Sequence, residues 1–98
     1  MTHDEIANAL AELGHSVRLN IVKMSIQAGK RGIAVGAIKN ALNIPGSTLT
    51  HHIQRLVKVD LIKQCRDKHT RYCCANFDNF FAVINYLKQD CCKGVSDE

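Results

Sequence analysis

Residues 44–71 constrain the fold of this 98-residue chain more than any other stretch. A Pro-Gly turn and then Ser47, taken as an N-cap, precede a run of residues with helical periodicity. On a helical wheel the apolar side chains of this run gather on one side, and they are Leu49, Ile53, Leu56 and Val57. This side of the helix is therefore predicted to face a hydrophobic core.

The other side of the same helix carries short hydrogen-bonding groups and cations. Its members are Ser47, Thr48, Thr50, His51, Gln54, Arg55 and Lys58. Hydroxyl, amide and imidazole groups can meet base edges or phosphates in a groove of DNA, and the cations are attracted to the phosphate backbone. An ordinary solvated helix face is the alternative interpretation.

A predicted β-hairpin follows this helix directly. Residues 61–66 and 70–75 have strand character, and Asp67, Lys68 and His69 separate them. The hairpin is basic because its tip and flanks carry Arg66, Lys68, His69 and Arg71 against a single acid. A helix followed at once by a basic hairpin predicts the recognition helix and wing of a winged helix-turn-helix, with Lys68 and Arg71 contacting phosphates.

The charge distribution supports a nucleic-acid surface at the centre of the chain. Residues 14–76 hold eleven Lys and Arg against two Asp, whereas both ends of the chain carry more acids than bases. A basic centre between mildly acidic ends is the footprint expected of a nucleic-acid surface.

Length and composition limit the remaining possibilities. Ninety-eight residues predict a single domain over 1–98, with a frayed tail near residues 94–98. The sequence has no apolar run long enough to span a membrane and no signal-peptide pattern at its start, so a cytoplasmic protein is expected. Five Cys in such a protein are expected to be reduced rather than paired in disulfides.

The helical periods predict four helices before the hairpin and one after it. They cover residues 4–13, 16–28, 33–42, the run after the Pro-Gly turn, and about 76 or 77 to 92. The second helix is apolar nearly all round, and we therefore expect it to be central and buried. The predicted fold class is mainly α with a small β-hairpin (α+β), in the order ααααββα.

The run PGSTLTHHIQRLVKVDLI, then the hairpin, then NFDNFFAVINYLKQDCC, resembles the ArsR family of metalloid- and metal-responsive bacterial repressors. The resemblance covers nearly the whole chain and implies a homodimer formed through the first and last helices, bound to double-stranded operator DNA. One branch of the family carries a Cys-Val-Cys pair on the third helix, where this chain has Ala34-Val35-Gly36. The zinc-sensing branches use a His on the last helix, but no His occurs here after His69.

The C-terminal run Asp90-Cys91-Cys92-Lys93-Gly94 resembles the Asn-Cys-Cys-x-Gly ending of an arsenic-responsive branch. The resemblance implies release from the operator when thiols bind trivalent arsenic, as arsenite or an organoarsenical, or antimonite, with no organic cofactor. Thiols suit such soft ions. Lys88 and Lys93 nearby favour the thiolate.

A third sulfur is expected from the hairpin, because the further Cys found in some members of that branch is missing. Strand alternation sends Cys73 and Cys74 to opposite faces. We expect Tyr72 and Cys74 to face the core, which leaves Cys73 as the partner of Cys91 and Cys92. The alternative is that both hairpin Cys are small buried hydrophobes.

Two other functions compete with a metalloid-responsive repressor. A repressor that senses oxidants or reactive sulfur through its thiols would have the same DNA-binding elements. A small thiol enzyme is the more distant alternative, but no Cys lies near an evident His base with an orienting acid. We therefore expect that the chain is not an enzyme.

Overall fold

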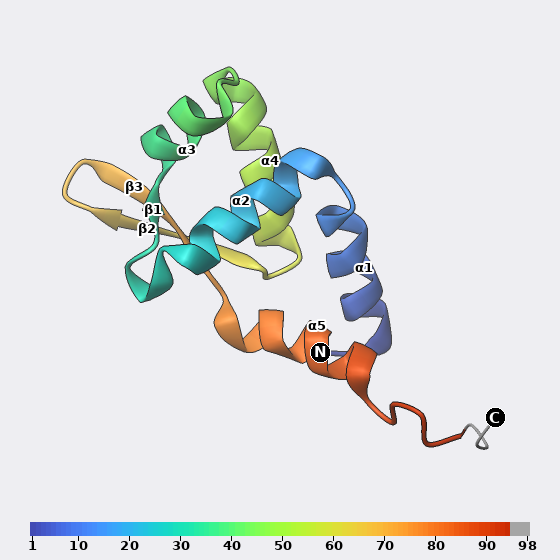
Figure 1. Cartoon of the computed structure of the whole chain (residues 1–98). Coiled ribbons are helices and arrows are strands. Elements are labelled where there is room, and N and C mark those ends of the chain that lie inside the picture. Colours follow the sequence, from blue (N-terminus) through green and yellow to red (C-terminus); the bar gives the residue numbers. More distant parts are fainter. Residues whose placement is uncertain (95–98) are drawn as a thin grey trace.

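The computed structural model describes residues 1–94, so most of the predicted tail at residues 94–98 lies outside the described residues. Within residues 1–94 it contains five α-helices, one 3-10 turn and one three-stranded antiparallel sheet (Figure 1). The elements are α1 (His3–Leu13), α2 (Ser16–Gln27), η1 (Gly29–Arg31), β1 (Ile33–Ala34), α3 (Val35–Leu42), α4 (Gly46–Lys58), β2 (Ile62–Asp67), β3 (Thr70–Ala75) and α5 (Phe77–Lys88). The predicted class and the predicted order of helices and hairpin are confirmed.

The strand β1 was not predicted, since the sequence pattern placed Ile33 and Ala34 at the start of a helix. In the structure Ile33 pairs with Cys73 and Ala34 with Tyr72, which adds a third strand beside the hairpin. Gly32 makes this possible with a φ of 81°, a conformation that L side chains rarely adopt. The helix α3 therefore begins at Val35.

The last helix is shorter than predicted. It ends at Lys88 rather than at Cys92, because Gln89 has extended backbone angles and both Asp90 and Cys92 have positive φ. Residues 84–94 are exposed, so the rest of the described chain does not pack against the end of the helix to stabilise it.

The core lies where α1, α2, α3, α4, the sheet and α5 meet. Its buried hydrophobic members are Ile6, Ala9, Ile21, Val22, Ile38, Leu49, Ile53, Leu56, Leu61, Ile62, Cys73 and Val83. The helix α2 is less buried than predicted, because only Ile21, Val22 and Ser25 are buried and Leu19 is 47% exposed. No helix within residues 1–94 is long and apolar enough to cross a membrane.

The helices α3 and α4 form a helix-turn-helix, with a turn that the sequence signals through its Pro-Gly pair. Asn43 ends α3 in the left-handed conformation (φ 51°, ψ 50°), which Asn tolerates better than most residues. Pro45 then caps α4 with extended backbone angles. The core residues Ile38, Leu49 and Ile53 fix the two helices against the rest of the domain.

Candidate nucleic-acid interface and thiol sites

The outer face of α4 is exposed as predicted. Ser47, Thr48, His51, Gln54 and Arg55 are exposed, and Thr50 is half-buried. The prediction that Ser47 is the N-cap is wrong, because the helix already begins at Gly46. The N-cap position is taken by Pro45, which makes no side-chain hydrogen bond. The Ser47 hydroxyl and the first-turn amides of α4 are therefore available to an outside partner such as a phosphate.

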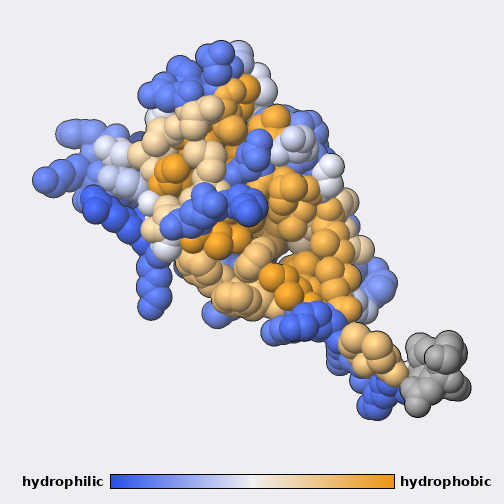
Figure 2. Space-filling model, viewed as in Figure 1, coloured by the Kyte–Doolittle hydropathy of each residue, from blue (hydrophilic) through white to orange (hydrophobic). Residues whose placement is uncertain are grey.

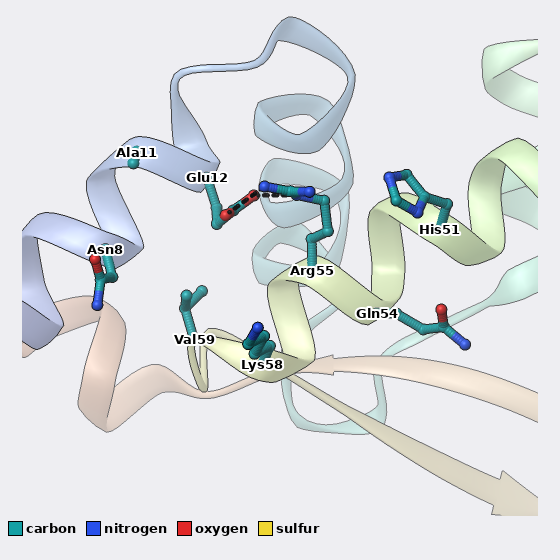
Figure 3. Close-up of a pocket in the computed structure, with 8 residues that line it drawn as sticks. All are labelled: Asn8, Ala11, Glu12, His51, Gln54, Arg55, Lys58 and Val59. Carbon is teal, nitrogen blue, oxygen red and sulfur yellow. Dashed lines mark hydrogen bonds and ion pairs between the residues drawn. The ribbon is translucent and has the colours of Figure 1, made fainter.

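Arg55 is engaged by a partner that the sequence did not indicate. Its Nε and Nη2 donate to the two carboxylate oxygens of Glu12 on α1, at 2.8 and 3.1 Å (Figure 3). The hydrogen bond from Arg55 holds the pKa of Glu12 below its usual value. The predicted role of Arg55 on DNA stays a prediction, but its charge is partly neutralised within the chain, which leaves Lys58 and the wing as freer cations.

Behind α4 lies a cluster of basic groups around His52, which is 8% exposed. Nη1 of Arg18 lies 3.0 Å from Nδ1 of His52. Because a guanidinium carries only donors, Nδ1 must accept, and His52 is therefore neutral. Burial lowers the pKa of His52, and His15 and Arg18 lower it further. Arg18 also donates to the Glu12 backbone carbonyl at 2.8 Å, so its role in the free protein is structural.

The two neighbouring histidines of α4 should respond differently to substitution. His51→Ala should mainly weaken DNA binding, because His51 is exposed at the centre of the outer face. His52→Ala should lower the free energy of unfolding by about 1–3 kcal/mol, because the half-buried Arg18 guanidinium would lose one of its acceptors and the core would lose the buried imidazole. Thermal melts and DNA titrations of both variants measure the two effects, and the reverse pattern would contradict this assignment.

The lowered pKa of His52 also predicts a pH dependence. Unfolded His52 takes up a proton below its ordinary pKa of 6.5, whereas folded His52 resists protonation. Stability should therefore fall as the pH drops below 6.5, and His52→Ala should reduce the slope of melting temperature against pH in this range. An equal slope in both proteins would remove His52 as its cause.

The wing presents cations that form no ion pair with the acids of residues 1–94. Cα pairing places Arg66 directly opposite Arg71, and both are exposed, as is Lys68 in the turn. Like charges directly opposite each other destabilise a sheet, so an outside anion would relieve this pair. No ion pair within residues 1–94 engages Arg66, Lys68 or Arg71. Arg66 was not among the predicted contacts. The predicted connection covered Asp67, Lys68 and His69, whereas in the structure Asp67 ends β2 and pairs with Thr70, which sets Arg66 opposite Arg71.

The predicted C-terminal thiol pair lies beyond the end of α5. The sulfurs of Cys91 and Cys92 are 3.4 Å apart and both residues are exposed. Bonds of about 2.3 Å from one soft atom to two thiolates place the sulfurs about 3–4 Å apart, so this pair fits a shared ligand atom. Lys93 contacts Asp90 at 3.3 Å rather than standing free beside the thiols.

The expectation for Cys73 is wrong in one respect. Cys73 is 0% exposed and belongs to the core, on the sheet face that Ile62 and Ala75 share. Burial raises the pKa of its thiol to about 11, which disfavours the thiolate that binds metalloids. Cys73 and Cys74 lie on opposite faces as predicted, but it is Cys73 that belongs to the core cluster. Cys74 is also buried, at 7% exposure, so the burial of both agrees with the alternative in which the hairpin Cys are small buried hydrophobes.

Cys73 is also not brought to the C-terminal pair. The chain beyond α5 runs away from the wing (Figure 1), and residues 1–94 contain no group of three or more Cys, His, Asp or Glu that could hold a metal ion. A three-sulfur site made of Cys73, Cys91 and Cys92 is therefore not assembled within one chain.

Large apolar side chains are exposed on α5 and the adjoining part of α1. Phe81 is 53% exposed and Leu87 63%, and Leu10, Ile84 and Tyr86 add to the same region. Figure 2 shows hydrophobic side chains gathered over this part of the molecule. His3 and Tyr86 are hydrogen-bonded, which helps to hold α1 and α5 together. Such an apolar surface is typical of a protein-protein interface.

Comparison with protein families gives a match to a helix-turn-helix domain over residues 13–65. A comparison with curated proteins gives no match. Among solved structures, an ArsR family transcriptional regulator is similar with a TM-score of 0.77 and 17% identity, over 95% of this chain and 99% of that chain. The transcriptional repressor BigR from Xylella fastidiosa has a TM-score of 0.68 and 22% identity, over 97% and 91% of the two chains.

A third similar structure is the homodimeric winged helix-turn-helix DNA-binding domain of Mb0332 from Mycobacterium bovis, described as a possible ArsR-family transcriptional regulator. It has a TM-score of 0.66 and 20% identity, over 97% of this chain and 88% of that chain. Together these likenesses show that the fold is the winged helix-turn-helix of ArsR-family regulators.

Proposed function

Because the chain belongs to the helix-turn-helix domain family, whose model matches more than half of it, we propose that it is a transcriptional repressor that binds operator DNA as a homodimer. It leaves the DNA when Cys91 and Cys92 bind trivalent arsenic. The observation that carries the DNA-binding part is the exposed polar face of α4, followed directly by a wing whose cations have no acidic partner within residues 1–94. Regulators of this kind are not enzymes.

Homodimer formation is supported by two observations. The exposed apolar side chains of α1 and α5 would be buried in an interface between two chains, and one structural neighbour of the same fold is a homodimer. A two-fold dimer presents two recognition helices to half-sites about one turn of DNA apart. The two α4 helices of the dimer would then read a palindromic operator.

The thiol geometry supports an inducer that takes two sulfurs. Cys91 and Cys92 are close, exposed and separate from Cys73, so one chain offers two thiols rather than three. Trivalent arsenic that carries one organic substituent has two positions left for protein sulfur. We therefore favour an organoarsenical over arsenite or antimonite, each of which takes three sulfurs.

Sensing by a disulfide between Cys91 and Cys92 is the second candidate, but its geometry is poor. Consecutive Cα atoms are about 3.8 Å apart across a trans peptide, below the 4.4–6.8 Å or so that disulfides span. An arsenic atom bound by both sulfurs does not require this Cα–Cα distance. A sensor of reactive sulfur would still respond to persulfide, so the two inducers must be compared directly.

The test uses the purified chain with its thiols reduced beforehand and the reductant then removed. Its operator is selected from random DNA by the protein itself, and binding is followed by fluorescence anisotropy with phenylarsine oxide, arsenite, peroxide or persulfide. Release by phenylarsine oxide at lower concentration than by arsenite, and no release by peroxide or persulfide, is expected. Release by persulfide alone would support the sulfur-sensing alternative, and absence of sequence-selective binding would contradict the repressor.

Two kinds of DNA contact should separate by mutation. Gln54→Ala should relax the preference at one base position, because an amide contact to a base edge contributes about 1–3 kcal/mol to discrimination. Lys68→Ala or Arg71→Ala should weaken binding to all sequences alike and flatten its salt dependence. Titrations at several salt concentrations measure both effects, and unchanged slopes in both wing variants would remove the wing from the interface.

A further inference from the structure

Two other cysteines lie together on the outer face of the wing. Cys65 pairs with Tyr72 across the hairpin and Cys74 pairs with Lys63, so Cys65 and Cys74 are diagonal neighbours on one face. Cys65 is close enough to Cys74 to contribute to the raised pKa of the Cys74 thiol. This is the face opposite the one that Cys73 shares with Ile62, so these two thiols do not belong to the core cluster.

Both thiols line the same hollow in the surface. It has a volume of about 480 Å³, and its walls are Lys30, Lys63 and the start of α5 at Asn76, Phe77 and Asp78, together with Ala75. Cys65 is exposed, whereas Cys74 is 7% exposed at the inner side. A small molecule that enters the hollow therefore meets Cys65 first and reaches Cys74 behind it.

The backbone beside Cys74 is built closely around its sulfur. The thiol donates to the carbonyl oxygen of Arg31 at 3.7 Å. A Cβ at Gly32 would lie 2.7 Å from the sulfur, so only glycine leaves the thiol in this position. The sulfur is thus held in one place, facing the hollow and Cys65.

The charges around the hollow are mixed, because two lysines and one aspartate are among its lining residues. Lys63 is the cross-strand partner of Cys74, and Lys30 and Asp78 line the same hollow. Burial raises the pKa of Cys74 to about 11, and Lys63 opposes that rise. Cys74 therefore stays protonated until a ligand displaces its proton.

We propose that Cys65 and Cys74 form a second dithiol site, which binds a trivalent arsenical with one organic substituent. The exposed Cys65 sulfur bonds to arsenic and displaces one hydroxide, which leaves as water with the thiol proton. Cys74 then displaces the second hydroxide in the same way, so two As–S bonds replace two As–O bonds and nothing is oxidised or reduced. Within residues 1–94 no third Cys, His or acid completes this pair, so arsenite is the poorer ligand.

A bridging atom suits this pair better than a disulfide does. Diagonal neighbours across an antiparallel pair are about 7–8 Å apart, beyond the range of about 4.4–6.8 Å that disulfides span. An inserted arsenic lengthens the link because two bonds of about 2.3 Å replace one sulfur–sulfur bond of about 2.05 Å. The site does not depend on the proposed sensor pair, which lies on another element.

The experiment starts from the Cys91→Ser/Cys92→Ser chain, so that the C-terminal pair cannot contribute. Phenylarsine oxide is added with an excess of a monothiol, which removes arsenic from single cysteines, and intact mass spectrometry counts the phenylarsenic groups that remain. One group per chain is expected. Adding Cys65→Ser should abolish it without unfolding the chain, because Cys65 is exposed.

Cys73→Ala in the same background is the matched control, since it removes a neighbouring cysteine of the same strand and should keep the adduct. Circular dichroism checks the fold of each variant. An adduct that survives Cys65→Ser, or no adduct in the starting chain, would overturn the proposal. The adduct count and the circular dichroism spectra are both measured without DNA and on chains that lack Cys91 and Cys92. Their outcome therefore does not depend on whether the proposed release from the operator occurs.

Discussion

Replacing Phe81 and Leu87 by aspartate should convert the dimer into a monomer and weaken operator binding by at least a hundredfold. Burying one such side chain contributes about 1.5–3 kcal/mol, and a two-fold interface contains each position twice. The substitutions remove that gain and place four like charges in the interface. A monomer then holds only one half-site, so the second set of DNA contacts is lost.

Sedimentation velocity measures the first effect, and anisotropy with selected operator DNA measures the second. The fold should persist because Phe81 and Leu87 are exposed in the single chain. Asn85→Asp is the control, since it adds a charge to an exposed position of α5 without removing apolar area. A dimer of unchanged stability in the double variant would place the interface elsewhere.

The α4 helix and the hairpin were predictable because their signals are local. Periodicity separates Leu49, Ile53 and Leu56 from the polar face, and these residues are buried as predicted. The second hairpin strand was predicted with its observed bounds, whereas the first lies one residue further along, at Ile62–Asp67 rather than 61–66. Ser47 was misassigned as the cap because Ser is a favoured N-cap, whereas here Pro45 occupies that position with backbone angles alone.

The errors concern contacts between residues distant in the sequence. The pairing of Glu12 with Arg55 spans 43 positions and leaves no local pattern. The assignment of Cys73 failed for a related reason, because alternation gives two faces but not which of them is buried. Which face of the hairpin packs on the core depends on distant core residues and on the pairing of β1 with β3. The strand β1 has only two residues, so periodicity in the sequence could not predict it. The end of α5 was misplaced because the apolar stripe of Phe80, Ile84 and Leu87 continues in sequence to Cys91, although no other part of residues 1–94 buries the positions after Val83.

The second large effect concerns the switch. Cys91→Ser with Cys92→Ser should leave operator affinity unchanged within about twofold and abolish release by phenylarsine oxide. Both residues are exposed beyond α5, on the far side of the molecule from the wing (Figure 1), so they contribute neither to the core nor to the predicted DNA contacts. In the wild type, a coupling of about 1–3 kcal/mol would weaken operator binding roughly 5- to 150-fold.

The direction of the switch follows from linkage. An inducer shifts the equilibrium only by its preference for the released arrangement, so the thiols must bind arsenic better off the DNA than on it. By reciprocity, operator DNA should weaken arsenical binding to Cys91 and Cys92 by the same factor. Titrating phenylarsine oxide into the Cys65→Ser chain, with and without DNA, measures that factor at the C-terminal pair alone. If the Cys91/Cys92 double variant is still fully released from DNA at the arsenical concentration that releases the wild type, the C-terminal pair is not the sensor. The sensor would then be the pair in the wing, because Cys65 and Cys74 lie on the same two strands as Arg66 and Arg71.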